Sequence, residues 1–398
     1  MRERVEEARF LRPELAMVRW AGSVREVRSQ EHPGFQVDRA RFDALLLDAA
    51  SEAGARVLQS ARVESIDPGW QLRARTLRGS LLIVAEYLVD ASGRVCLSGG
   101  KRVMQSAPLL ALWAYWRCPR KFGPETRVES GEAEWFWGAP LPDGSFNATV
   151  LMDPKRYRES GRQALYELVL AKSKLMCDCL SEERLTEVAV CDATPFCVEE
   201  MISRQAVKIG EAAFALDPLS SQGVHTAMGS ALHAATAIHT MANRPDSSEV
   251  AMRFYAARQR EAVATHREAW EGFYHDAAAH HGSEFWTRRA GTERAATESG
   301  GPPESLPPPD LMLDTPAGVE LCVVPCQCGD YVVEMRGIKH GSLRRPLVFL
   351  EDVAVADLWE RVTWPARAGD VVRAWSDKVG AERALRILGL LWQSRLFR

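Results

Sequence analysis

The 398-residue chain lacks several features that would restrict its function at once. It has no GxxxxGK loop, which excludes the usual phosphate cradle of nucleoside triphosphatases. Apolar runs such as 81–84 and 388–392 are too short to span a bilayer. The first twenty residues are charged and contain no hydrophobic signal core. We therefore expect a cytoplasmic protein without a membrane partner.

The chain also lacks an excess of one charge and a cysteine pattern typical of metal binding. The 50 Lys and Arg residues nearly balance the 53 Asp and Glu residues, and no polybasic arm occurs, so we expect no nucleic-acid ligand. Nine scattered cysteines favour reduced thiols in the cytosol. The closest groups, Cys177/Cys179 and Cys322/Cys326/Cys328, do not have the paired CxxC spacing of structural zinc. We expect no metal site.

Apolar periodicity and turn residues divide the chain into segments. The expected elements are a helix within 34–57 that stops at Gly54, a strand over 61–67, a three-stranded meander over 71–94 and a strand at 109–117. Two further strands around a Pro-Asp-Gly turn within 132–152 and helices near 160–180 and over 249–281 complete the set. Residues 291–310 have the composition of a linker. Residues 311–398 predict a separate module of three strands, with a turn at Gly329-Asp330, and three short helices, the first capped by Asp352.

The stretch GEAAFALDPLSSQGVHTAMG (210–229) places Asp-Pro and a Ser-Ser-Gln-Gly turn directly before a helix. Glycine permits close approach of the backbone, and a helix N-terminus offers unpaired N–H groups and a positive dipole. On this segment alone, an ordinary capped helix and a site that faces an electron-rich group are equal alternatives.

Three blocks in order favour the second alternative. VDRARFDALLLDAASEAGARV (37–57), VDASGR (89–94) and IGEAAFALDPLSSQGVHTAM (209–228) resemble conserved blocks of FAD-dependent monooxygenases and flavin-dependent halogenases. EWFWGAP (134–140) resembles the WxWxIP block of the halogenase branch, with Ala139 where Ile is usual. The resemblance covers about residues 10–290 and implies FAD as the cofactor.

The resemblance implies an α/β fold in which a doubly wound FAD-binding domain is interrupted by a mostly antiparallel substrate sheet and followed by a small winged-helix-like α+β module. Such proteins begin with a strand, a GxGxxG turn and a helix, and this sequence contains no GxGxxG, so we expect the first βαβ unit to be missing. The expected parts are 1–105 (FAD-binding domain, first part), 106–185 (substrate sheet and helix), 186–290 (FAD-binding domain, second part, and long helix), 291–310 (linker) and 311–398 (C-terminal module).

The resemblance also implies cofactor contacts, because the helix start would face the pyrimidine edge of the flavin ring and stabilise negative charge there. The expected contacts are Arg39 (phosphate or ring edge), the backbone of Val63 (adenine), Asp90 and Gly93 (nucleotide site), Glu211, where Asp is usual (ribityl chain), and Asp217, Pro218, Gln222, Gly223 and Val224 at the helix start. Trp135 and Trp137 are expected to line a substrate tunnel, with two core aromatics on one strand face as an equal alternative. His225 is placed near the ring, although packing is the commoner role of such a histidine.

The first hundred residues contain no lysine, whereas the family's halogenases place one shortly before the tryptophan that matches Trp20. Arginine is permanently protonated and cannot replace that amine. We therefore expect an FAD-dependent monooxygenase in which the flavin activates O2 for hydroxylation of an electron-rich aromatic ring. A flavin-dependent halogenase is the alternative. A flavin-less relic or a substrate-presenting binding subunit is the alternative of another class.

The C-terminal module is similar to small peptide-recognition domains of peptide-modifying enzymes. The whole layout is similar to the flavoprotein monooxygenases that mature quinohemoprotein amine dehydrogenase. This likeness implies post-translational modification of a tryptophan in a peptide or protein by strand addition to the module, and a lid or dimerisation module is the alternative. An aromatic small molecule is the other expected substrate, and the electrons would come from a flavin reductase or NAD(P)H.

Overall fold

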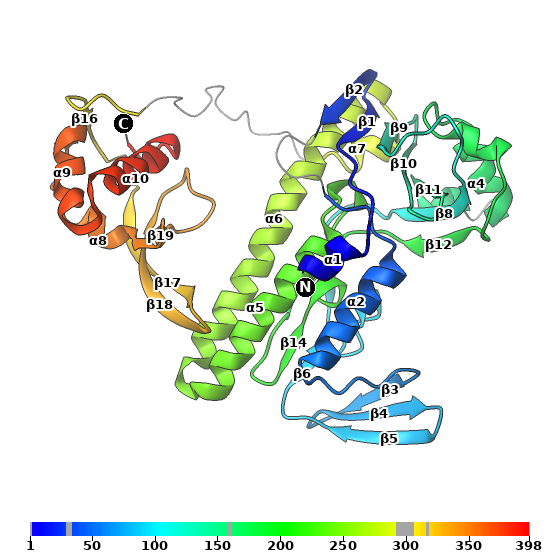
Figure 1. The fold of residues 1–398 in the computed structure, drawn as a ribbon, viewed down its shortest axis with the longest axis horizontal. Helices are drawn as coiled ribbons and strands as arrows, with labels where there is room; N and C mark the ends of the chain where they lie inside the picture. Colours follow the sequence, from blue (N-terminus) through cyan, green and yellow to red (C-terminus); the bar gives the residue numbers. More distant parts are fainter. Residues whose placement is uncertain (1, 29–33, 158–160, 292–305, 316–317, 398) are drawn as a thin grey trace. The chain divides into compact units, whose positions relative to one another are not determined.

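The computed structural model describes every residue except 1, 29–33, 158–160, 292–305, 316–317 and 398 (Figure 1). The described residues form a mixed α/β fold, as predicted, and group into two units. Residues 1–201, 205–230 and 260–294 make the first unit, and residues 202–204, 231–259 and 295–398 make the second. Most of the expected linker over 291–310 lies outside the described residues.

A seven-stranded sheet in the order β12-β8-β11-β10-β9-β1-β2 forms the framework of the first unit. Its strands are β1 (Leu15–Trp20), β2 (Ser23–Arg28), β8 (Leu110–Arg117), β9 (Thr126–Ser130), β10 (Glu134–Pro140), β11 (Ser145–Met152) and β12 (Ala189–Asp192). All neighbouring strands are antiparallel except β1 and β9. The mostly antiparallel sheet is therefore confirmed, and it also takes in β1, β2 and β12 from outside residues 106–185.

Helix α4 (Arg162–Leu170) packs against this sheet and supplies part of its core. Phe146 and Val150 of β11 are fully buried together with Tyr166 and Leu170 of α4. The helix expected near 160–180 is shorter than predicted. The chain leaves the helix because the hydroxyl of Ser173 and the next two backbone N–H groups donate to the buried carboxylate of Glu129.

The first unit also contains a short pair of parallel strands, β6 (Leu88–Asp90) and β14 (Ala206–Lys208). The meander expected over 71–94 is wrong in its third strand, because the antiparallel sheet consists of β3 (Arg62–Asp67), β4 (Gln71–Thr76) and β5 (Gly79–Val84). β6 leaves that sheet because its buried ends, Leu88 and Asp90, form backbone hydrogen bonds with the segment that contains β14. Among the described residues, β6 and β14 represent the doubly wound sheet.

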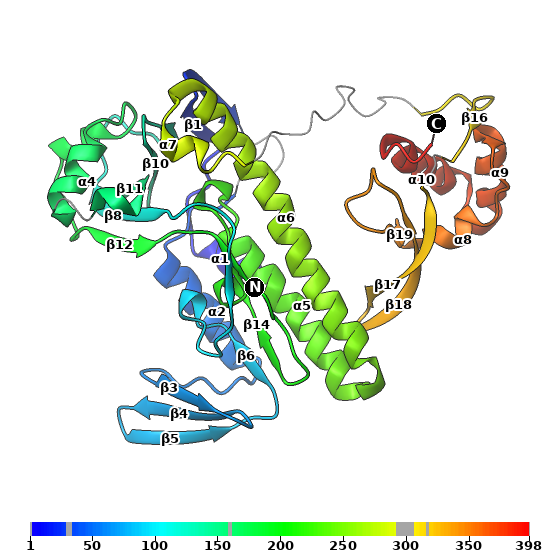
Figure 2. The same cartoon turned by 180° about the vertical axis from the view of Figure 1, so that it is seen from behind.

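The other elements of this unit include the antiparallel sheet β15-β13-β7 and several helices. They are α1 (Arg2–Glu7), α2 (Arg39–Glu52), β7 (Arg102–Met104), α3 (Pro154–Tyr157), β13 (Phe196–Val198), β15 (Phe214–Ala215) and α7 (Glu284–Thr287). Helices α5 (Gly223–Asn243) and α6 (Ser248–His281) run side by side in both views (Figures 1 and 2), and α6 confirms the long helix predicted over 249–281.

In the second unit, residues 306–397 form the strand-and-helix module that the sequence predicts. Its elements are β16 (Met312–Leu313), β17 (Glu320–Cys328), β18 (Tyr331–Lys339), β19 (Phe349–Leu350), β20 (Val353–Ala354), α8 (Val355–Trp359), β21 (Ala366–Arg367), α9 (Ala368–Val379) and α10 (Ala381–Gln393). β17 and β18 pair across the predicted turn at Gly329-Asp330. Asp352 does not cap the first helix: Glu351 and Asp352 have positive φ angles and form the turn between β19 and β20, so α8 begins only at Val355.

The module has its own core, in which Leu358, Val371 and Leu391 are fully buried. The β17–β18 hairpin is attached to α5 by a 2.9 Å hydrogen bond from the Val332 N–H to Thr240 Oγ1. Within the part of the chain that the structure describes, no helix combines the length and apolar character needed to cross a membrane.

Candidate functional site

The two strands of the parallel pair end side by side. Asp90 of β6 lies opposite Lys208 of β14, and the Ile209 N–H donates to the Asp90 carbonyl at 2.9 Å. The short helices that follow, η1 (Gly93–Val95) and η3 (Gly210–Ala212), contact each other. In open α/β sheets, ligands bind at the carboxyl ends of parallel strands. The fold therefore brings together two sequence blocks, 89–94 and 209–228, at the edge where a ligand is expected.

Asp90 organises the first of these loops. Its buried carboxylate accepts hydrogen bonds from the N–H and hydroxyl of Ser92, at 2.9 and 2.5 Å, and from those of Ser98, at 2.7 and 2.6 Å. Burial alone would raise the pKa of Asp90, but these donors hold it below its ordinary value. Gly93 has φ 65° and open space where a side chain would project. Asp90 thus shapes the loop, and the backbone at Gly93 is its open part.

Glu211 is held by an arginine that the sequence-based prediction missed. Arg94 Nε lies 3.6 Å from Glu211 Oε1, and its Nη1 donates to the Thr194 carbonyl at 3.0 Å. Arg94 is the last residue of the VDASGR block. Its position directly after Gly93 is the signal in the sequence that could have identified it. The ion pair joins the two loops, and the contact of Glu211 with a ribityl chain stays a prediction.

The start of α5 has open backbone donors. Asp217 accepts from the Leu219 N–H at 3.0 Å and caps the 3-10 turn over Pro218–Ser220. Among the described residues, the N–H groups of Gly223, Val224 and His225 have no recorded acceptor. A Cβ built on Gly223 meets no atom within 4 Å. This arrangement fits the flavin edge, because a helix of 21 residues directs free donors and its positive dipole toward open space.

The helix start is fixed in place by its contact with η3. The Gly210 N–H donates to Ser230 Oγ at 2.8 Å. A side chain on Gly210 would meet the Ala227 methyl at 3.2 Å and would require φ 55°, so the glycine permits this close approach. The loop after β14 and the start of α5 therefore form one rigid corner.

A buried polar pair lies behind this corner. Asp217 is 1% exposed, and its Oδ2 accepts a 3.0 Å hydrogen bond from the hydroxyl of Tyr274 on α6. Burial raises the pKa of Asp217 to about 6, against the opposing effect of the Leu219 and Tyr274 donors. Sequence reasoning missed Tyr274, because a tyrosine at an apolar position of a long helix resembles an ordinary core residue.

The two candidate pocket tryptophans have different environments. Trp135 is 1% exposed and packs edge-to-face on Trp20, with 6.4 Å between ring centroids. Trp20 in turn packs on Trp286 at 5.4 Å. Trp135 is therefore buried among aromatic side chains, and its role in a substrate tunnel stays a prediction. Trp137 is only partly buried, and its role as a pocket wall stays a prediction.

Three other candidate residues lie at the surface or in separate elements. Arg39 is exposed at the start of α2 and pairs with Asp43 at 3.1 Å. Val63 is half-buried in β3 and lies opposite Ala74 of β4. His225 is exposed on the first turn of α5.

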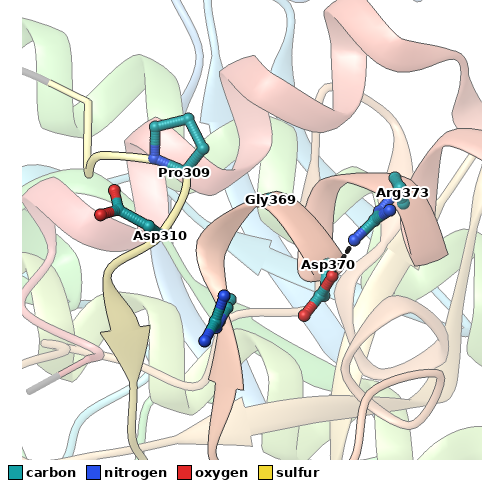
Figure 3. Close-up of a pocket in the computed structure, with 6 residues that line it drawn as sticks. Pro309, Asp310, Gly369, Asp370 and Arg373 are labelled. Atoms are coloured by element: carbon teal, nitrogen blue, oxygen red, sulfur yellow. Dashed lines mark hydrogen bonds and ion pairs between the residues drawn. The ribbon is translucent and has the colours of Figure 1, made fainter.

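The described residues contain no group of three or more potential His, Cys, Asp or Glu metal ligands. Three cavities found among these residues do not include the loops at Gly93 and Gly223. Two adjoining cavities of about 440 and 470 Å³ lie in the C-terminal module and share Arg367 and Asp370. In Figure 3, Asp310 and the start of α9 line the first cavity, and Asp370 of this helix pairs with Arg373. Side chains with charges of both signs line these cavities.

Comparisons with known proteins agree with this arrangement. The family model described as tryptophan halogenase matches residues 8–299. The protein named FAD-dependent oxidoreductase LodB, from Marinomonas mediterranea, is 32% identical over 218 residues, which cover 51% of this chain and 58% of that protein. A tryptophan 2-halogenase from Chondromyces crocatus is 26% identical over 52% of this chain and 44% of its own length. The chain thus spans only about half the length of these curated relatives.

Two solved structures have the same fold. The flavin-dependent halogenase CmlS superposes with a TM-score of 0.81 at 20% identity and covers 100% of this chain and 85% of its own. The peptidyl tryptophan dihydroxylase QhpG, described as essential for tryptophylquinone cofactor biogenesis, superposes with a TM-score of 0.73 at 23% identity and covers 96% of this chain and 84% of its own. At these identities the likeness establishes the fold alone.

Proposed function

Because this chain belongs to the tryptophan halogenase family, we propose that it acts as an FAD-dependent monooxygenase that hydroxylates an electron-rich aromatic substrate. The observation that carries the proposal is the open N-terminus of α5 beside the carboxyl ends of β6 and β14. The Gln222 N–H already donates to Ser220 Oγ at 3.4 Å, so the N–H groups of Gly223 and Val224 would hold the flavin edge. Gly93 and Glu211 would contact the rest of the cofactor. Bound FAD would supply the activation of O2, and the protein would position the substrate and exclude water.

FAD binding is tested first with the 398-residue chain by quenching of flavin fluorescence. Gly223 and Gly229 both lie in α5 with open space at the Cβ position, so alanine is tolerated sterically at both. We expect Gly223→Ala to weaken binding by roughly tenfold, about 1.4 kcal/mol, because a methyl group would separate the flavin from the helix start. Gly229→Ala is the matched control and should bind as the parent chain does. Equal weakening by both substitutions would contradict the proposed flavin position.

Hydroxylation is favoured over halogenation by the absence of lysine from residues 1–100. The name of QhpG supports hydroxylation, whereas most named relatives are halogenases. The two activities are separated by turnover of an indole with FAD, a flavin reductase, O2 and bromide. We expect a product that has gained oxygen. A bromine isotope doublet in its mass spectrum would make the chain a halogenase.

For the substrate, we propose a tryptophan side chain within a peptide or protein, with a free aromatic compound as the second possibility. The support is the charged pair of cavities in the C-terminal module, a surface suited to a polar chain. Turnover of a tryptophan-containing protein should fall when Arg367 and Arg361 are changed to Ala, while turnover of free indole stays constant. A parallel loss of both activities would argue against peptide recognition. Peptide binding without any FAD binding would instead favour a substrate-presenting subunit.

A further inference from the structure

Two buried tyrosines of the first unit have different hydrogen-bond acceptors. Tyr274 donates to the carboxylate of Asp217 at 3.0 Å, and both side chains are almost completely buried. Tyr166 donates at 2.9 Å to the backbone carbonyl of Ala148 and accepts from the Trp116 indole. A carboxylate can take up a proton, whereas a peptide carbonyl is a very weak base. Of these two tyrosines, Tyr274 is therefore the one whose hydroxyl lies within hydrogen-bond distance of a basic group.

Tyr274 also belongs to a continuous group of indoles. Its ring centroid lies 5.6 Å from that of Trp286, which lies 5.4 Å from Trp20, and Trp20 lies 6.4 Å from Trp135. Ring edges at these separations are in or near van der Waals contact, so an electron can move between neighbours without large rearrangement. The Trp20 indole is fixed by a 2.9 Å hydrogen bond from its Nε1 to the Phe273 carbonyl. The group extends from the buried Asp217 to the turn between β1 and β2.

We propose that Tyr274 is a one-electron relay that removes oxidising equivalents from this indole group. When a strong one-electron oxidant of the radical class oxidises Trp286 or Trp20, Tyr274 returns one electron to the indole. The phenolic O–H bond breaks at the same time, and the proton moves to Asp217. The products are a neutral indole, a neutral tyrosyl radical and a protonated Asp217. A thiol-class reductant then supplies the electron that restores the phenol, and Asp217 returns the proton.

This role goes beyond the proposed oxygenation and does not require it. It would protect the buried indoles of this group from irreversible oxidation. Asp217 suits the step, because burial raises its pKa to about 6, so it is ionised at neutral pH yet is a stronger base than an exposed carboxylate. Burial is the main cause that raises the pKa of Tyr274 well above its ordinary value. The proton therefore stays on the phenol until oxidation.

The test uses pulse radiolysis with azide radicals, which oxidise indoles selectively, and follows the indole-radical and phenoxyl-radical absorption bands. We expect Tyr274→Phe to remove the fast transfer from indole to phenol that the parent protein shows. Tyr166→Phe is the matched control and should keep it. Asp217→Asn keeps the phenol but removes the base, and the transfer should slow by roughly tenfold. Equal transfer in Tyr274→Phe and the parent would overturn the proposal.

A second measurement on the unaltered protein guards against a variant that does not fold. Because an O–H bond breaks in the transfer step, the fast phase should be slower in D2O than in H2O. A fast phase with the same rate in both solvents would also overturn the proposal.

Discussion

The seven-stranded sheet and the parallel pair β6–β14 differ in strand length and in how deeply their side chains are buried. β11 has eight residues, and its Phe146 and Val150 are completely buried. β6 and β14 have three residues each, and Val89 in the middle of β6 is 43% exposed. Parallel strands are usually buried on both faces. The comparison indicates that the antiparallel sheet carries the stability of the first unit, whereas the parallel edge carries the features that suit a ligand.

The largest effect should come from the sheet. Phe146→Ala removes a fully buried ring that packs on Phe122, and we expect a loss of about 3–5 kcal/mol in the free energy of unfolding. Val89→Ala, the counterpart in β6, should cost less than about 1 kcal/mol because the side chain is partly exposed. Urea unfolding followed by tryptophan fluorescence measures both. Similar losses would break the comparison.

Asp217, which caps the 3-10 turn before α5, should give the start of α5 a pH-dependent weakness. Its folded pKa of about 6 lies above the unfolded value, so its stabilising contribution is complete below about pH 4 and is lost as the pH rises through 6. The shift of about two units corresponds to roughly 3 kcal/mol between these limits. Asp217→Asn should abolish this part of the pH dependence. Urea unfolding of both proteins is measured between about pH 4.5 and 7.5, roughly the range in which Asp217 titrates. The difference in the free energy of unfolding between the parent and Asp217→Asn must grow with pH.

Substitution of Asp90 measures how much its hydrogen bonds stabilise the parallel pair β6–β14, which has few buried apolar side chains. Asp90→Asn puts an amide donor against a loop that supplies only donors from Ser92 and Ser98, and we expect a loss of about 2 kcal/mol. Ser98→Ala removes one donor and should cost about 1 kcal/mol. If FAD binds, its affinity should fall more for Asp90→Asn than for Ser98→Ala. Unchanged stability in the asparagine variant would mean that the loop does not depend on the carboxylate.

The smallest effect is expected in the β3-β4-β5 sheet. Leu82 of β5 is 57% exposed, and Leu82→Ala should change the free energy of unfolding by no more than about 0.5 kcal/mol. A loss above 2 kcal/mol in the same assay would indicate that a partner or another segment covers this face in solution.

Local chemistry made the β10–β11 hairpin predictable, because a Pro-Asp-Gly turn separates two apolar runs. The place of β1 was not predictable in the same way. It pairs with β9 in parallel, with Ala16 opposite Thr126, and no local pattern encodes a partner so distant in the sequence. β6 was assigned to the wrong sheet for the same reason, because its partner β14 lies far along the chain.

The residues of the candidate site also differ in whether a local sequence pattern could predict them. The blocks that contain Asp90 and Gly223 could be recognised from sequence, since each is a contiguous motif. The pairings of Arg94 with Glu211 and of Tyr274 with Asp217 could not, because each joins residues from separate elements. Their chemistry exists only after the elements have packed together.

The position of β1 also affects the order in which the protein can fold during its synthesis. Trp20 leaves the ribosome early, yet it packs against Trp286 and donates to the Phe273 carbonyl, both of which are made much later. β1 and β2 lie at one side of the sheet and pair only through β9, so β8 to β11 can assemble before this edge closes. We expect nascent chains to remain open there, with Trp20 accessible to quenchers, until α7 has emerged.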